Sequence, residues 1–206
     1  MTRALAIRGT LISLAVVLVL SGVMLAGVTR PYVLSTGSME RTLLPGDYFL
    51  VRPLSGAPLQ RGEIVQMRYP VDPSQTWIKR IAAIGGDHVR FHDKTLILNG
   101  SPVTEPYAIH TTSYIDPFRD NFPAVPNFRL QGNWADTLAK STVNGELVVP
   151  EGKFFVLGDN RDNSLDSRYF GFVDRAYIIG KPLVIYFSAD PAHRSGIRWQ
   201  RMFHMF

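Results

Sequence analysis

The chain has 206 residues, of which 46% are hydrophobic and 19% charged, and it contains no cysteine. This balance excludes a disordered chain, and the missing cysteine excludes disulfides and thiolate catalysis. The net charge is +5, but Arg3, Arg8 and Arg30 flank an apolar segment, and the remainder carries 19 Lys and Arg against 17 Asp and Glu. That near-neutral remainder argues against a nucleic-acid partner.

The N-terminal apolar segment, residues 11–28, has no charge. A helix needs about 20 apolar residues to cross a bilayer, and the apolar part of a cleaved signal peptide is shorter, about 7–15 residues. Length and flanks therefore favour one uncleaved transmembrane helix. Arg3 and Arg8 precede it, which predicts a cytosolic N-terminus and an extracytoplasmic chain after Arg30.

The sequence STGSMERTLLPGD follows at residues 35–47. A run of small residues there is compatible with a flexible connection. Ser38 is a candidate nucleophile only if a base lies within hydrogen-bond reach and a donor faces the oxyanion. The five histidines occur in no catalytic or metal-binding spacing, so a lysine is the remaining candidate base.

Most of the chain after the apolar segment reads as β structure. Short runs of β-branched, aromatic and aliphatic residues are separated by Gly-containing turns, and Asn99-Gly100 is a strong hairpin signal. No long stretch has firm helical periodicity. The strands are expected at residues 48–52, 63–68, 77–84, 88–92, 95–103, 153–157 and 176–187.

Lys79 is the informative lysine. Alternation along the strand at 77–84 puts it on a face with Trp77, Ile81 and Ala83, while Arg80 takes the other face. Such a lysine either extends its amine to water or is desolvated, and desolvation lowers its pKa toward that of a useful base. The spacing alone favours a lysine whose amine reaches water.

Two further segments have less regular patterns. Residues 104–149 are rich in Pro, Asn, Asp and aromatics and read as an irregular insertion, in which Trp134 and the Phe residues pack on the β core and 117–128 has no assigned role. Residues 158–168, GDNRDNSLDSR, form a polar loop that fits no EF-hand frame and is expected to order itself through its own hydrogen bonds. Its composition leaves a functional loop and a structural turn equally open.

The last ten residues, 197–206, place Trp199, Met202, Phe203 and Phe206 at helical spacing. The favoured interpretation is a terminal segment packed on the core. A membrane-touching amphipathic tail is the alternative.

Together, the TGSM segment, the Lys79 strand and the 158–168 loop resemble the bacterial signal peptidase I family of membrane-bound Ser–Lys endopeptidases. The resemblance also covers residues 45–47, 61–65 and 85–87 and is weakest at 104–149. It implies a mostly β fold with an antiparallel catalytic core. Residues 1–30 would hold the cytosolic N-terminus and single transmembrane anchor, and 31–206 an extracytoplasmic peptidase domain with its irregular insertion at 104–149.

The resemblance also implies roles for single residues. Ser38 matches the nucleophile and Lys79 the general base. Thr36 matches a hydroxyl that completes the oxyanion hole with the Ser38 N–H, and Ser164 matches the residue that orients the lysine amine. Met39 matches a residue of the substrate cleft.

The polar loop matches a supporting element. Gly158 and Asp159 open it, and Asp166 with Arg168 matches an ion pair that holds it beside the site. One departure is Arg41, where the family usually has Pro, which would stiffen the turn after the nucleophile.

The implied partners are secreted preproteins with small residues, often Ala, at the first and third positions before the cut. Membrane lipid and nearby secretion machinery are implied too, whereas cofactors, metals and nucleic acid are not. A pilin-maturing peptidase would use the same chemistry on a narrower substrate. A self-cleaving repressor-type protease would need a DNA-binding domain in place of the apolar segment, and a non-catalytic β module would not need Ser38 or Lys79.

Overall fold

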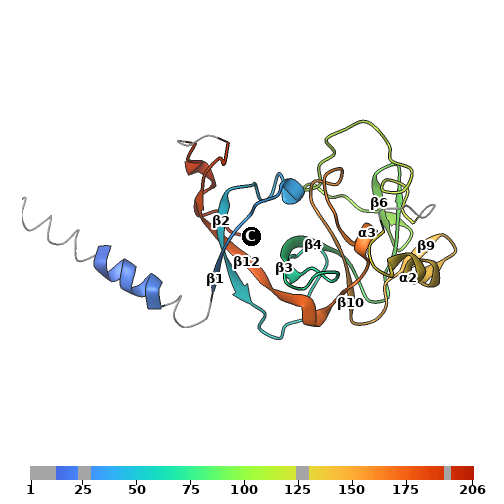
Figure 1. Cartoon of the computed structure of the whole chain (residues 1–206), viewed down its shortest axis with the longest axis horizontal. Coiled ribbons are helices and arrows are strands. Elements are labelled where there is room, and N and C mark those ends of the chain that lie inside the picture. Colours follow the sequence, from blue (N-terminus) through green and yellow to red (C-terminus); the bar gives the residue numbers. More distant parts are fainter. Residues whose placement is uncertain (1–12, 23–28, 124–129, 193–195) are drawn as a thin grey trace, which may run out of the picture.

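The structure is a computed structural model that describes residues 13–22, 29–123, 130–192 and 196–206 (Figure 1). Its elements after the N-terminal segment are β1 (Arg30–Val33), η1 (Gly37–Met39), β2 (Asp47–Pro53), β3 (Ile64–Arg68), β4 (Thr76–Ile84), β5 (His88–His92), β6 (Thr95–Leu98), β7 (Ser101–Pro102), α2 (Trp134–Ser141), β8 (Thr142–Val143), β9 (Glu146–Val148), β10 (Lys153–Leu157), α3 (Ser167–Phe170), β11 (Val173–Asp174), η2 (Arg175–Tyr177), β12 (Ile178–Ser188) and η3 (Trp199–Arg201).

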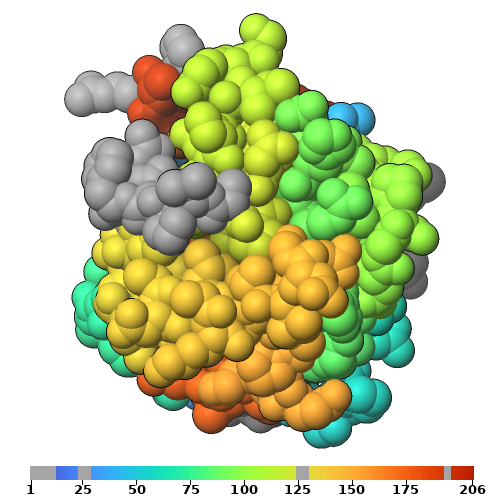
Figure 2. Space-filling view, turned by 90° about the vertical axis from the view of Figure 1, so that its right-hand side faces the viewer, coloured from blue at the N-terminus to red at the C-terminus, as the bar shows by residue number. Residues whose placement is uncertain are grey.

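The described strands form two antiparallel sheets. The larger has seven strands in the order β1-β2-β12-β3-β4-β10-β11, and the smaller has five in the order β7-β6-β5-β9-β8. The chain leaves the larger sheet at the end of β4, builds the smaller sheet, and returns as β10, which pairs with β4. Figure 2 views the molecule from the side of the smaller sheet and α2, whose residues cover this face.

The strand predictions for the β core are confirmed. The expected runs at 88–92 and 153–157 coincide with β5 and β10, and the expected hairpin is formed by β6 and β7. Asn99 and Gly100 occupy its turn with φ of 52° and 79°, the left-handed values that this dipeptide tolerates.

The segment at 104–149 is more regular near its end than its composition suggests. It contains α2, and β9 joins the smaller sheet by pairing with β5. Trp134, Phe118 and Phe122 are buried in one apolar cluster with residues of both sheets, as the sequence predicted. Of the loop expected at 117–128, residues 124–128 lie outside the described residues.

Strand β4 connects the three buried apolar clusters of the molecule. Ile78 belongs to the cluster with Phe49, Ile81 to the cluster with Met67, and Ala83 to the cluster with Phe155. Most of β4 is buried because β3 and β10 flank it on both edges. Side chains on β4 are therefore held by packing on every side, which suits a strand that carries a functional group.

The C-terminal tail packs on the β core through its backbone, but the helical spacing of its residues does not produce an α-helix. The described tail contains one three-residue 3-10 turn, η3, and then an extended stretch that bridges β12. Ile185 donates its N–H to His204 O and accepts from Phe203 N–H, so the tail covers β12 where β12 has no β3 partner. The side chains of Trp199 and Phe203 remain exposed. Backbone pairing with an open strand edge has overridden the local helical pattern.

At the other end, residues 13–22 are helical and the rest of the expected span, 11–12 and 23–28, lies outside the described residues. Within the described ranges, no helix combines the length and apolarity that a membrane crossing requires.

Asp47 ties the tail to the larger sheet. It is fully buried and accepts hydrogen bonds from Ser188 Oγ at 2.6 Å, Arg201 Nη2 at 2.6 Å and Leu44 N–H at 2.8 Å. We expect Asp47→Ala to lower the free energy of unfolding by about 2–3 kcal/mol, because the buried Ser188 and the partly buried Arg201 lose their acceptor. Denaturant unfolding measures this. Asp174→Ala, which removes a half-exposed carboxylate, is the matched control and should cost less than about 0.5 kcal/mol; equal losses would contradict the account.

Candidate active site

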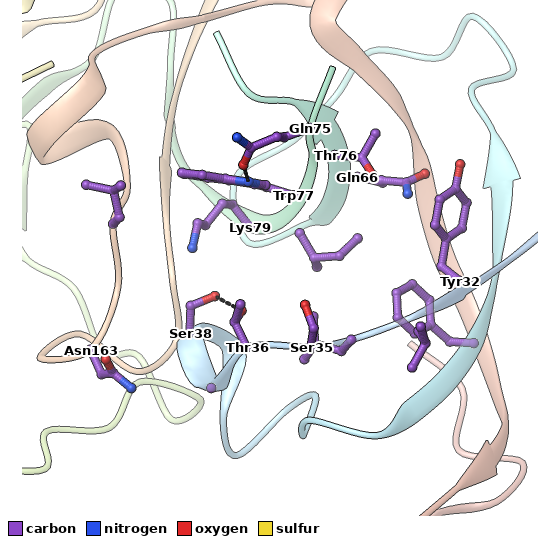
Figure 3. Close-up of a pocket in the computed structure, with 16 residues that line it drawn as sticks. Tyr32, Ser35, Thr36, Ser38, Gln66, Gln75, Thr76, Trp77, Lys79 and Asn163 are labelled. Carbon is purple, nitrogen blue, oxygen red and sulfur yellow. Dashed lines mark hydrogen bonds between the residues drawn. The ribbon is translucent and has the colours of Figure 1, made fainter. Parts of the chain in front are cut away.

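A groove of about 530 Å³ runs between the β1–β2 side and the β3–β4 side of the larger sheet (Figure 3). Apolar side chains make up much of its wall, including Phe49, Ile78 and Leu165. Ser38 and Lys79 both line it. Among the described residues no group of three or more His, Asp or Glu is placed to hold a metal ion.

Ser38 lies in the connection between β1 and β2, which is closed by the hydrogen bonds Leu34 N–H to Asp47 O and Gly46 N–H to Leu34 O. The chain is extended at Thr36 and then tightens into η1, which presents Ser38 to the groove. The Ser38 hydroxyl lies 3.3 Å from the Thr36 hydroxyl. The sequence therefore brings these two groups together through one local turn.

Met39, the next residue, does not line the groove. It is fully buried in the apolar cluster that contains Leu43 and Phe49. In this structure Met39 anchors the turn by packing in that cluster.

Lys79 is 3% exposed and points from β4 into the site. Its amine donates a hydrogen bond to Ser164 Oγ at 3.1 Å and lies 5.6 Å from the centre of the Trp77 ring. Burial lowers the pKa of Lys79 to about 8; Arg168 also lowers it, while Asp166 and Asp159 act in the opposite direction. About a tenth of this amine is therefore neutral at pH 7, far more than for an ordinary lysine.

The two candidate catalytic groups face the same space. Figure 3 shows the amine end of Lys79 directed toward Ser38. Within the described part of the chain, the Lys79 amine is hydrogen-bonded to Ser164 and the Ser38 hydroxyl to Thr36, with no direct bond between the pair. Catalytic hydrogen bonds are often long without substrate and tighten when it binds.

The polar loop is ordered by a buried ion pair. Arg168 Nη2 lies 2.8 Å from Asp166 Oδ2, and both side chains are at most 1% exposed. Asp166 also accepts the N–H of Gly158 and caps α3, and Arg168 donates to Arg161 O at 2.8 Å. Burial alone would raise the pKa of Asp166, but Arg168 and these hydrogen bonds hold it below its usual range. The carboxylate is thus ionised and committed to holding the loop.

The loop also touches the turn that carries Ser38. Asn160 donates its N–H to Ser38 O at 3.1 Å and its side-chain amide to Glu40 at 2.8 Å. A Cβ on Gly158 would lie 2.2 Å from Ser164 Oγ and 2.5 Å from Ser38 O. Glycine is therefore required at position 158, where the start of the polar loop passes close to Ser38 and Ser164.

Sequence reasoning missed Arg80, which it placed on the opposite face of β4 without a role. Arg80 donates to both carboxylate oxygens of Asp159, at 2.8 and 2.6 Å, and Thr42 Oγ1 donates to the same carboxylate at 2.5 Å. This buried group links β4, the start of the polar loop and the turn after Ser38. The sequence feature that could have indicated this role is a charged arginine within a mostly apolar strand.

The turn after Ser38 excludes proline at position 41. Arg41 has φ of +82°, which a proline ring cannot adopt. The turn is held instead by N–H groups of Thr42 and Leu43, which both donate to Met39 O, and by the bond from Thr42 to Asp159.

A β fold that presents a serine hydroxyl and a desolvated lysine amine to one groove has the arrangement of a serine hydrolase whose base is lysine. The chain also matches the family model described as signal peptidase, peptidase S26, over residues 7–187. The match covers most of the chain, which therefore belongs to this family.

Individual relatives agree with the family model. Signal peptidase I of Aquifex aeolicus (strain VF5) is 35% identical over 78% of this chain and 77% of its own length. Signal peptidase I of Bacillus caldolyticus is 33% identical over 73% of this chain and 75% of its own. The crystal structure of a signal peptidase I from Enterococcus faecalis V583 shares 32% identity, with a TM-score of 0.43, over 61% of this chain and 97% of that one.

The close approach at Gly158 gives a first test of the site. We expect Gly158→Ala to lower kcat/KM for a cleavable peptide by about 100-fold, because the methyl group displaces Ser164 or Ser38 from its position. Gly100→Ala is the control: no atom lies within 4 Å of its added Cβ, and it should cost stability without changing kcat/KM. Equal activity in the two variants would contradict the proposed contact.

Burial of Lys79 predicts a pH-dependent gain in stability when its amine is removed. Below about pH 8 the Lys79 amine is charged in both states, and the folded protein must bury that charge. Between about pH 8 and 10.5 only the unfolded chain keeps the proton, so the free energy of unfolding of wild type rises with pH in this range. Lys79→Met should exceed wild type in free energy of unfolding by about 3 kcal/mol at pH 7, a difference that vanishes above about pH 10.5.

Denaturant unfolding across this pH range measures the difference, and Lys140→Met, which removes an exposed amine, should show no such trend. A constant difference between Lys79→Met and wild type would show that the amine is not desolvated.

Proposed function

We propose that this chain is a signal peptidase I that removes N-terminal signal peptides from secreted preproteins. As a member of its family the chain is a serine endopeptidase. The observation that carries the assignment of roles is the Lys79 amine, which is buried, hydrogen-bonded to Ser164 and directed into the groove that Ser38 lines. Such an amine can accept a proton near neutral pH.

The first half of the reaction forms an acyl-enzyme. Neutral Lys79 takes the proton of the Ser38 hydroxyl as Oγ attacks the carbonyl carbon of the scissile peptide bond. The oxyanion is stabilised by the Ser38 N–H and the Thr36 hydroxyl, each donor being worth about 3–4 kcal/mol in a comparable serine protease. The 3.3 Å distance between the Thr36 and Ser38 hydroxyls supports this role for Thr36. Lys79 then gives its proton to the leaving amine, which departs as the mature protein's N-terminus.

The second half releases the signal peptide. Neutral Lys79 takes a proton from water, whose oxygen attacks the ester carbonyl, and returns a proton to Ser38 Oγ as the ester bond breaks. Ser164 supports both halves by accepting a hydrogen bond from the amine at 3.1 Å, which fixes its direction. Asp166, Arg168, Gly158 and Asp159 hold the loop that carries Ser164.

The same proposal specifies the membrane topology and the substrates. Residues 1–30 anchor the enzyme through a single span with a cytosolic N-terminus, and residues 31–206 act at the outer face of the cytoplasmic membrane. Preproteins with small residues at the first and third positions before the cut would reach the groove there, next to membrane lipid and the secretion machinery. The apolar wall of the groove favours substrates with small, uncharged side chains.

Cleavage of a preprotein by the full chain in detergent tests this function. We expect Ser38→Ala to abolish cleavage, while Ser101→Ala, at an exposed serine of β7, leaves it unchanged. For wild type, kcat/KM should rise with pH and reach half of its maximum near pH 8, where Lys79 loses its proton. Retained cleavage by Ser38→Ala, or an optimum in acid, would refute the assignment.

A further inference from the structure

A short segment that follows β7, residues 105–109, lies against the polar loop at 158–168, and we call it the strap. Ile109 of the strap donates its N–H to Asp159 O at 2.8 Å and accepts the N–H of Arg161 at 3.0 Å. These two bonds make a parallel bridge between the strap and the loop. The irregular insertion at 104–149 therefore begins with a segment that is attached to the loop beside the catalytic groups.

Glu105 compensates a buried charge at the centre of the polar loop. Arg161, whose side chain is 2% exposed, donates from Nη1 and Nη2 to the two Glu105 carboxylate oxygens at 2.6 and 2.7 Å. This is the bidentate geometry in which an arginine holds a carboxylate most firmly. The Nε of Arg161 donates to Gly158 O at 3.0 Å, and its carbonyl accepts from Arg168 at 2.8 Å. Arg161 thus links the beginning of the loop to the ion pair near its end.

Tyr107 connects the same carboxylate to Arg80. Its hydroxyl donates to Glu105 Oε1 at 3.2 Å, and the Arg80 guanidinium lies 3.8 Å from the centre of its ring. Burial raises the pKa of Tyr107 to about 12, so the hydroxyl keeps the proton that it donates. Because Arg80 holds Asp159, the strap contacts both arginines that fix the start of the polar loop.

The loop that the strap holds reaches both catalytic groups. Its Asn160 N–H bonds to Ser38 O, and its Ser164 accepts the hydrogen bond from the Lys79 amine. The strap itself does not line the substrate groove, and neither does Arg161. A substitution in the strap therefore removes no side chain that a peptide in the groove would touch.

We propose that Glu105 and Tyr107 are positioning residues for the catalytic step. They act through Arg161 and Arg80 on the loop that carries Ser164, and the inference rests on the proposed function. Without Glu105 the charge of Arg161 would be buried and uncompensated, so the loop would shift until that charge reached water or another carboxylate. A displacement of about 1 Å in a reacting group can lower the rate about 100-fold.

Steady-state cleavage of a peptide by the full chain in detergent tests the proposal, at a temperature at which circular dichroism shows every variant folded. Glu105→Gln keeps the shape of the side chain and removes its charge. We expect it to lower kcat about 10-fold and to leave KM within about 2-fold of wild type, because the loop is displaced while the groove keeps its lining. Glu146→Gln makes the same change at a carboxylate that contacts His88 and Arg90 in the smaller sheet, and it should leave kcat unchanged.

Two further comparisons show whether the strap acts by the proposed route. Tyr107→Phe keeps the ring on Arg80 and should lower kcat about 2-fold, whereas Tyr107→Leu loses both contacts and should lower it about 10-fold. In an Arg161→Gln background, Glu105→Gln should have no further effect on kcat, because its partner is already gone. If Glu105→Gln does not fold, the two Tyr107 variants decide the proposal.

The opposing outcomes are distinct. A wild-type kcat in Glu105→Gln overturns the proposal, and so does a loss confined to KM, which would mean that the strap supports substrate binding. An equal loss in Glu146→Gln, equal activity of the two Tyr107 variants, or additive losses in the Arg161→Gln background would also overturn it. If wild type cleaves the peptide no faster than Ser38→Ala does, the proposed function itself fails, whereas an active wild type matched by Glu105→Gln refutes the strap alone.

Discussion

The amine of Lys79 is removed from water, and most features of the site follow from that constraint. A charged amine at this depth lacks its hydration shell, so the folded protein binds the proton less tightly than the unfolded chain does. Of the remaining influences on its pKa, Asp166 and Asp159 favour the charged form and Arg168 disfavours it. A lone buried carboxylate beside Lys79 would have restored the ammonium and removed the base.

This constraint explains why the loop at 158–168 contains so many charges without using them as acids. Its carboxylates are paired with arginines: Asp166 with Arg168, and Asp159 with Arg80. The pairs keep net charge near Lys79 low while fixing Ser164 beside the amine. The intact pairs hold the loop rigid. Removing one member of a pair would leave the other charge buried and uncompensated, so the loop is sensitive to substitution at these residues.

The parts predictable from sequence were those with a local cause. Strand alternation placed Lys79 among apolar neighbours, and Asn99-Gly100 specified its hairpin because few other residues accept the required φ. The roles of Ser38 and Ser164 came from the family resemblance, since their approach depends on the pairing of β4 with β10 and on the contact of Asn160 with Ser38. No local pattern encodes contacts over such sequence separations.

The errors have the same origin. The tail has helical spacing, yet it pairs with the open edge of β12, which local sequence does not reveal. Arg80 was assigned only to the other face of its strand, because alternation says which face a side chain takes and not what covers that face.

The central claim is that the Lys79 amine is neutral when the enzyme works, and titration of that amine by NMR tests it most directly. Lysine side-chain signals would be followed with pH in the folded wild type, with the Lys79 signal assigned by its absence from Lys79→Met. A midpoint near pH 8 is predicted, well below the other lysines. A midpoint near 10.5, the ordinary value for lysine, would contradict the account.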